Sequence, residues 1–146
     1  MNAGGVDKAC KSNARSWTLD VRSWKNGTMR TVKSFHDLEV YQRASDLFPT
    51  VYKIVRSWSA LDQRELGSQM IRAANSIHAN IAEGFTKTPN DFKRFLGIAI
   101  GSCNELMSHI IDAHRIQLIG EKDKIKLLHE YNIVVKQLVR LKQNWH

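Results

Sequence analysis

The sequence predicts an all-α protein, an antiparallel up-down-up-down four-helix bundle. Three observations lead to this prediction. From Ser34 onward apolar residues recur at helical spacing in four blocks, no segment alternates as a strand would, and the chain has only two prolines. Its 146 residues, with a mass of 16.7 kDa, fit one domain. We therefore place a single bundle domain in residues 34–146.

The first predicted helix begins at Ser34, whose hydroxyl can accept a hydrogen bond from a backbone N–H of the first turn. The acidic Asp37 follows three residues later, as in a capping box. Pro49 lies inside this helix and removes one backbone donor, so we expect a kink or a local bulge there. The segment from Ser57 to Leu61 is predicted to be a short polar connection. The apolar stripe comprises Leu38, Tyr41, Ala44, Leu47, Phe48, Val51, Val55 and Trp58.

The second predicted helix begins with Asp62 as its N-cap and has Glu65 three residues later. Small residues fill its middle and allow another helix to approach closely, so we expect this helix at the centre of the bundle. Gly84 is typical of the C-terminal region of a helix. The apolar face comprises Leu66, Met70, Ala73, Ala74, Ile77, Ile81 and Phe85.

The third predicted helix has the strongest start signal, with Thr88 as the cap, Pro89 in the first position and Asp91 in the third. Apolar residues continue from there to Leu118, and Gly120 closes the helix. Because these residues occupy more than one side, we expect this helix to pack against neighbours beyond the bundle core.

The fourth predicted helix starts near Glu121 and is amphipathic. Its apolar side comprises Ile125, Leu128, Tyr131, Val134, Val135, Leu138, Leu141 and Trp145. Its other side is basic and comprises Lys122, Lys126, Lys136, Arg140 and Lys142.

The net charge of +8 is unevenly distributed. Residues 1–33 carry +5 and residues 34–146 only +3. The first segment is rich in Gly, Ser and Asn and has no long apolar period, so we interpret residues 1–33 as a flexible basic tail. Such a tail could act as an arm on nucleic acid. Alternatively it is an over-long start, with Met29 as the true initiator.

Composition excludes several classes of protein. Two cysteines, Cys10 and Cys103, cannot build a disulfide framework and indicate a reducing compartment. No apolar run is long enough to span a membrane, and the N-terminus has no apolar signal region. We therefore expect a soluble, cytoplasmic protein.

No motif predicts catalysis, a metal site or a cofactor. His109 and His114 are five residues apart and fall on different helix faces, and Glu105 with His109 has no matching second pair. The chain has no glycine-rich phosphate loop and no nucleophile elbow. Cys103 lies in the apolar stripe of the third helix and is interpreted as a packing residue. We predict a protein that is not an enzyme.

A polar motif interrupts the second helix. We interpret it as structural and expect Asn80 and Glu83 to hydrogen-bond across helices or to the following loop, because buried polar groups must be paired. Glu83 and Lys87 are also spaced for an ion pair. The alternative is a carboxylate poised for acid–base chemistry. The motif comprises Gln69, Arg72, Asn80, Glu83 and Gly84.

Two basic groups are the candidates for nucleic-acid binding. Along the fourth helix, positions 136, 140 and 143 share one face, which predicts a basic stripe. A solvated helix face is the alternative interpretation. The candidate residues are Lys87, Lys93 and Arg94 near the second turn, with Lys136 and Arg140 in the fourth helix.

Three stretches together resemble a known family. They are residues 69–84 (QMIRAANSIHANIAEG), residues 35–44 (FHDLEVYQRA) and residues 92–106 with their GSCNEL ending. From about Ser34 to the C-terminus the chain resembles the four-helix-bundle proteins encoded in 23S rRNA intervening sequences. The resemblance implies a ring-like homopentamer. It also implies kinship with the accessory variability determinant of diversity-generating retroelements, a basic pentamer that binds a reverse transcriptase and nucleic acid. It supplies no catalytic residues.

The residues and the resemblance together predict a non-enzymatic, cytoplasmic, homopentameric scaffold that binds RNA or a nucleoprotein partner. The alternatives are a metal-binding or enzymatic bundle, built around Glu83, Glu105 or a histidine, and an adaptor that binds only protein.

Overall fold

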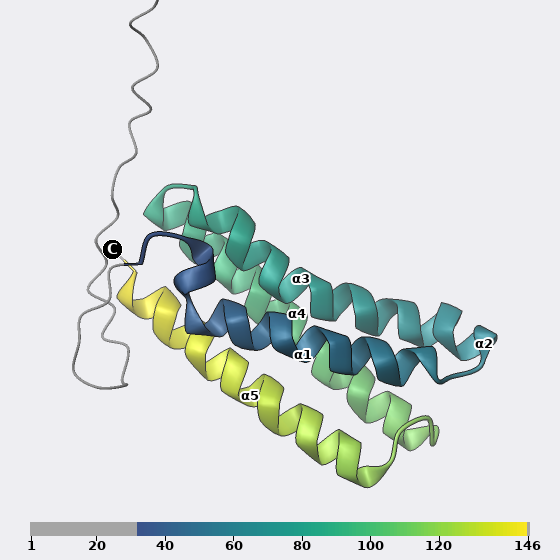
Figure 1. Ribbon diagram of the computed structural model, residues 1–146. Coiled ribbons are helices and arrows are strands. Elements are labelled where there is room, and N and C mark those ends of the chain that lie inside the picture. Colours follow the sequence, from purple (N-terminus) through teal and green to yellow (C-terminus); the bar gives the residue numbers. More distant parts are fainter. Residues whose placement is uncertain (1–31, 146) are drawn as a thin grey trace, which may run out of the picture.

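The computed structural model describes residues 32–145, and all regular structure within this range is helical (Figure 1). The predicted tail, apart from Val32 and Lys33, lies outside the described residues. The elements are η1 (Phe35–Asp37), α1 (Glu39–Arg56), α2 (Ala60–Asp62), η2 (Gln63–Gly67), α3 (Ser68–Phe85), α4 (Pro89–Arg115) and α5 (Glu121–Asn144). The prediction of an all-α bundle is confirmed.

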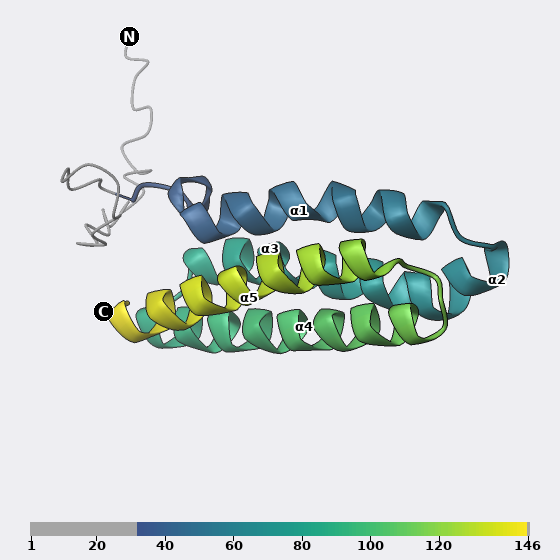
Figure 2. The same cartoon turned by 90° about the horizontal axis from the view of Figure 1, so that it is seen from below.

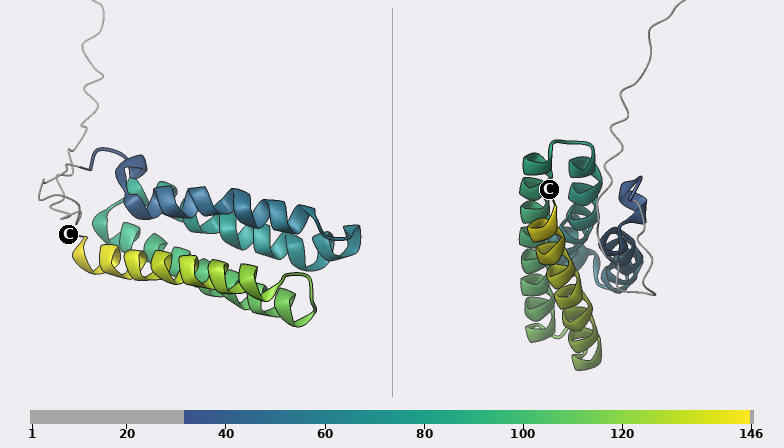
Figure 3. Two further views of the ribbon diagram at one scale, coloured as in Figure 1. Left: turned by 60° about the horizontal axis from the view of Figure 1, so that its bottom comes forward. Right: turned by 90° about the vertical axis from the view of Figure 1, so that its left-hand side faces the viewer.

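The four long helices form a bundle in which each packs against two others. α1 packs on α3 and α5, and α4 also packs on α3 and α5. The α1–α3 side and the α4–α5 side therefore lie opposite each other, as the end-on view of Figure 3 shows. In Figures 1 and 2, α1 and α4 run away from the end that holds the C-terminus, and α3 and α5 run back towards it.

The core lies along the axis between these helices. Its largest fully buried side chains include Tyr131, Phe92, Met70, Leu96 and Leu106. Most of the apolar stripe of α4 faces this core, and only Ile98 and Ile111 of its large apolar residues are exposed. The expected second apolar surface of this helix is therefore small.

The start of the first helix differs from the prediction. Ser34 forms the expected capping box with Asp37, but this box caps only the short turn η1, and extended backbone at Leu38 separates η1 from α1. Val32 is buried and the Lys33 N–H donates to Asp37 Oδ2 at 2.9 Å, so the folded part begins before Ser34. α1 continues as an α-helix through Pro49 without the expected bulge.

The bulge lies instead at the beginning of the second helical segment. Ser59 is the N-cap, three residues earlier than predicted, and its Oγ accepts from the Asp62 N–H at 3.2 Å. The π-helical turn η2 follows. Gly67 lies in this turn so close to α1 that a Cβ would overlap the side chain of Val55. The missing side chain allows α1 and the start of α3 to approach.

The third helix begins as predicted and ends earlier. Thr88 Oγ1 accepts from the Asp91 N–H at 3.2 Å. The helix ends at Arg115, where Gln117 adopts a φ of 64°. The Leu118 N–H donates to the Ala113 carbonyl at 2.8 Å and the Gln117 N–H to that of His114 at 3.0 Å, which is the Schellman arrangement.

Gly120, predicted to close this helix, is the N-cap of α5 instead. In α5 the stripe also shifts slightly, because Ile125 is exposed and Leu127 is buried. The prediction missed the role of Gly120 because a glycine suits either end of a helix. It missed the shift in the stripe because Ile125 and Leu127 are both apolar and lie within one turn of each other.

Gly84 lies at the closest approach of α3 and α4. It is a helical residue in the last turn of α3, and a Cβ there would stand 2.6 Å from Phe95 Cβ and 2.8 Å from a ring atom of Phe92. Its role is therefore close packing between helices, which the sequence did not indicate.

We expect Gly84→Ala to lower the free energy of unfolding by about 1–3 kcal/mol, because the added methyl group must displace Phe95. Gly101→Ala is the matched control, since a Cβ there meets nothing within 4 Å in the same helix bundle. It should raise stability by about 0.5–1 kcal/mol through helix propensity. Urea unfolding measures both, and equal effects of the two substitutions would contradict the packing role.

We expect Gln117→Gly to raise the free energy of unfolding by about 0.5–1 kcal/mol, because glycine adopts a positive φ without the steric cost that glutamine bears. Lys126→Gly, at an exposed position inside α5, should lower it by a similar amount. Thermal and urea unfolding test the difference. A decrease in stability at both positions would show that Gln117 is not strained.

Candidate nucleic-acid interface

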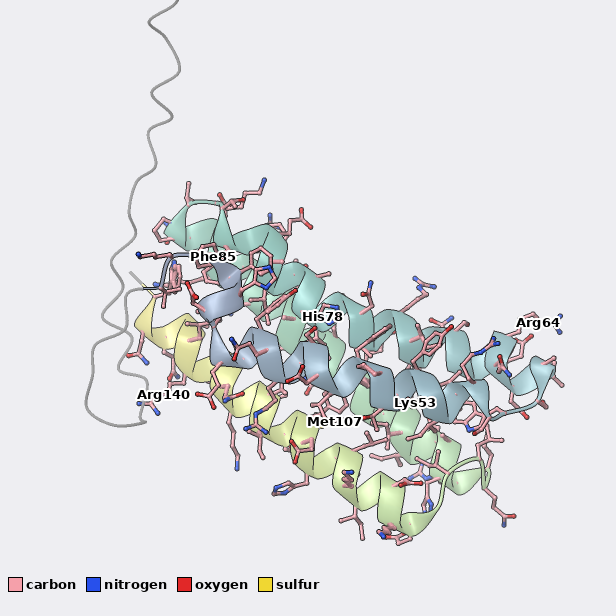
Figure 4. All side chains as sticks on the ribbon, in the orientation of Figure 1. Lys53, Arg64, His78, Phe85, Met107 and Arg140 are labelled. Atoms are coloured by element: carbon pink, nitrogen blue, oxygen red, sulfur yellow. The ribbon has the colours of Figure 1, made fainter. Side chains whose placement is uncertain are left out.

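The outer face of α5 carries unpaired basic side chains. Lys136 and Arg140 are exposed and one turn apart, as predicted. Figure 4 labels Arg140 on α5. Lys122 and Lys126 repeat this spacing nearer the start of the helix. Within residues 32–145 none of these four forms an ion pair. The face therefore presents positive charge that is available to an external anion.

Lys124 of α5 and His114 of α4 are already paired with the same carboxylate. Lys124 Nζ donates to Glu121 Oε2 at 2.8 Å, and this contact lowers the pKa of the Glu121 carboxyl. The same carboxylate lies 2.8 Å from His114 Nε2, while His114 Nδ1 lies 3.1 Å from the Ile119 carbonyl. These contacts stabilise the turn between α4 and α5 and remove Lys124 from the candidate surface.

The C-terminal half of α5 meets the first turns of α4. The rings of Phe92 and Trp145 lie 4.4 Å apart, and Lys142 Nζ lies 3.2 Å from the position that a Cβ on Gly97 would occupy. Lys93 precedes Gly97 by one turn and so lies on the same side of α4. Lys142 therefore lies where α5 meets α4, on a different side of α5 from Lys136 and Arg140, and Lys93 is half-buried.

The remaining two predicted residues differ in their surroundings. Lys87 is exposed in the turn between α3 and α4, and its N–H donates to the Gly84 carbonyl at 3.0 Å. Arg94 lies 4.0 Å from Asp91 Oδ1 and stacks 4.7 Å from the centroid of the Phe95 ring. Its guanidinium therefore has partners of its own, and Arg94 is the weakest of the five candidates.

The polar motif follows the seam between α3 and α4. Asn80 donates within its own helix to Ser76 Oγ at 2.9 Å, and Ser76 Oγ hydrogen-bonds to Ser102 Oγ of α4 at 2.8 Å. Ser76 and Ser102, which were not predicted, thus make the link between helices that was expected of Asn80 directly. The sequence signal for these two serines is weak: Ser76 lies one turn before Asn80, and Ser102 directly precedes Cys103 of the apolar stripe.

Glu83 does not behave as expected. It is exposed, and its carboxylate pairs with neither Lys87 nor any other basic side chain in the described part of the chain. Arg72 is likewise exposed and Gln69 is half-buried. These side chains lie on the α4 side of α3, because 72, 76, 80 and 83 share one face of the helix.

The groups named for the enzymatic alternative do not converge. A shallow depression at the α1–α5 seam is lined by Glu39, Gln42, Arg43, Asp46, Leu47 and Glu130, and it contains neither Glu83, Glu105 nor a histidine. Among residues 32–145, no cluster of three His, Cys, Asp or Glu side chains is placed to hold a metal ion. Burial raises the pKa of the Cys103 thiol to about 12, so it stays protonated at neutral pH.

Residues 36–140 match the family model of the 23S rRNA-intervening sequence proteins. The chain belongs to this family. The resemblance drawn from the three motifs is thereby confirmed, and the match runs from η1 into the last turns of α5.

The fold of this intervening-sequence protein is similar to that of a solved structure. The solved structure is that of a protein of unknown function from the S23 ribosomal protein family of Bacteroides thetaiotaomicron, with a TM-score of 0.66 and 20% sequence identity. The similarity covers 71% of this chain and 95% of that chain. At this identity the likeness concerns the fold alone. The curated proteins include no match to this chain, and no helix in residues 32–145 is long and apolar enough to cross a membrane.

Proposed function

We propose that this intervening-sequence protein is a non-enzymatic cytoplasmic scaffold that assembles as a homopentamer and binds RNA, alone or in a nucleoprotein partner. The observation that carries the proposal is the outer face of α5, where Lys122, Lys126, Lys136 and Arg140 stand exposed without acidic partners in the described residues. Lys142 adds a separate cation where α5 meets Gly97 of α4.

Phosphate backbones are bound mainly by such unpaired cations, because each cation that neutralises a phosphate releases a condensed counterion. One copy offers a modest field, since residues 34–146 carry only +3. Five copies around one axis would repeat the basic face five times and combine its interactions on one RNA. The number five rests on the family resemblance, and the basic face gives the assembly its use.

We expect the purified full-length chain to have a mass several-fold above 16.7 kDa in light scattering at micromolar concentration. A pentamer is the specific expectation. A mass of one chain would overturn the assembly half of the proposal.

We expect the double substitution Lys136→Glu and Arg140→Glu to weaken RNA binding at least about 10-fold. It should also flatten the salt dependence of binding, by about 0.7 in the logarithmic slope for each phosphate of a single strand that is no longer neutralised.

The matched control is Lys53→Glu with Arg56→Glu, which changes net charge equally on α1. Fluorescence anisotropy over a salt series measures both. Equal weakening in the two variants would show that net charge alone acts, and a wild type without salt-dependent binding would overturn the RNA half.

Metal analysis of untagged protein separates this proposal from the enzymatic alternative. A stoichiometric metal would favour a metal-binding bundle, and its absence with RNA binding present supports the scaffold.

A further inference from the structure

The side of the bundle between α1 and α3 carries a row of aromatic side chains, which η1 covers at one end, where the rings of Phe35 and His36 lie 4.8 Å and 5.2 Å from that of Tyr41. The rings of Tyr41 and Phe48 lie 6.1 Å and 5.7 Å from that of His78, which Figure 4 labels, so rows from the two helices are adjacent. We call this surface the neutral face; it comprises Tyr41, Ser45, Phe48 and Tyr52 of α1 with Ile71, Asn75, His78, Ala82 and Phe85 of α3.

The neutral face is only partly covered by the bundle itself. Tyr52 is 44% exposed, Asn75 is exposed, and Tyr41, Phe48 and His78 are half-buried. Rings that are left half-exposed in a continuous row mark a surface that gains from further burial.

Both rows have the spacing of a helix-packing seam. Residues 41, 45, 48 and 52 are four, three and four apart, and residues 71, 75, 78, 82 and 85 follow the same rule. This is the heptad pattern by which one helix packs against another. The core stripe of α1 runs through Val40, Ala44, Val51 and Val55, so the row on the neutral face is a second stripe, turned outward.

Charge is sparse on this face and confined to the end where η1 packs on both helices and carries His36 and Asp37. The nine residues include no Lys, Arg, Asp or Glu, and burial lowers the pKa of His78, so its ring is neutral at pH 7. By contrast, Arg43 pairs with Glu130 at 3.0 Å between α1 and α5. The α3–α4 side carries Arg72, Glu83 and Glu105, and the α4–α5 side carries Lys93 and Lys142.

This neutrality also selects the occupant. RNA and anionic lipid surfaces are recognised by cations, which the face lacks. Two copies of a chain with a net charge of +8 repel each other least where neither presents charge. The Asn75 amide and the Ser45 hydroxyl can supply hydrogen bonds within an otherwise apolar contact.

We propose that the neutral face docks against a second copy of this chain, so that the outward rows of α1 and α3 lie in the contact between subunits. The inference rests on the proposed self-assembly and assigns its surface. The basic residues of α4 and α5 lie on the opposite side of the bundle, so this contact leaves them accessible to RNA.

Charge insertion tests the assignment. Tyr52→Lys on α1 and, separately, Asn75→Lys on α3 should each weaken self-association at least about 100-fold, because each places an unpaired charge in the contact. Val139→Lys is the matched control, since Val139 is 37% exposed and lies on α5. Sedimentation velocity over a concentration series gives the masses, and thermal melts monitored by circular dichroism show that each variant is folded.

Each outcome is informative. A reduced mass in Tyr52→Lys and Asn75→Lys, with Val139→Lys unchanged, supports the neutral face. Unchanged mass in both face variants, or an equal reduction in Val139→Lys, overturns this face but leaves the proposed assembly standing. A wild type that sediments as one chain overturns both the assembly and the assignment of the neutral face to it.

Discussion

The close approach of α3 and α4 sets the geometry on which the rest of the bundle depends. At Gly84 the two helices come so near that a Cβ would stand 2.6 Å from Phe95 Cβ. Further along the same seam, the Ser76 and Ser102 hydroxyls hydrogen-bond at 2.8 Å, which only short side chains on both helices allow. With this pair fixed, α1 and α5 pack against its other sides and enclose the buried core between them.

This arrangement separates the chemistry of the surface by side. The α3–α4 seam holds the polar motif, the α1–α5 seam holds the Arg43–Glu130 ion pair, and the α4–α5 side holds Lys142 beside Gly97. The outer face of α5 carries Lys136 and Arg140. The α1–α3 side is mainly aromatic, and its charged groups are confined to the end that η1 covers. The scaffold that we propose depends on such a division, because a surface that joins like-charged copies must differ from one that attracts a polyanion.

Much of this was predictable from local pattern. The Thr88-Pro89 start and the shared face of Lys136 and Arg140 follow from the 3.6-residue period and capping chemistry alone. Other details were not. Arg94 was an equal candidate in the sequence, yet its guanidinium stacks on Phe95 beside Asp91. The end of α4 depends on Gln117 in a conformation that favours glycine, so composition pointed to Gly120 instead.

Local pattern specifies the helices, their order and most of their core-facing stripes, because burial of apolar residues repeats with the helical period. What each remaining side of a helix meets depends on tertiary packing. Tyr41 and Phe48 belong to an apolar stripe in the sequence, but the packing of α1 beside α3 leaves them half-exposed around His78. Sequence periodicity specifies the direction of each side chain around its own helix axis. A surface formed by two helices also depends on their relative position, which periodicity does not specify.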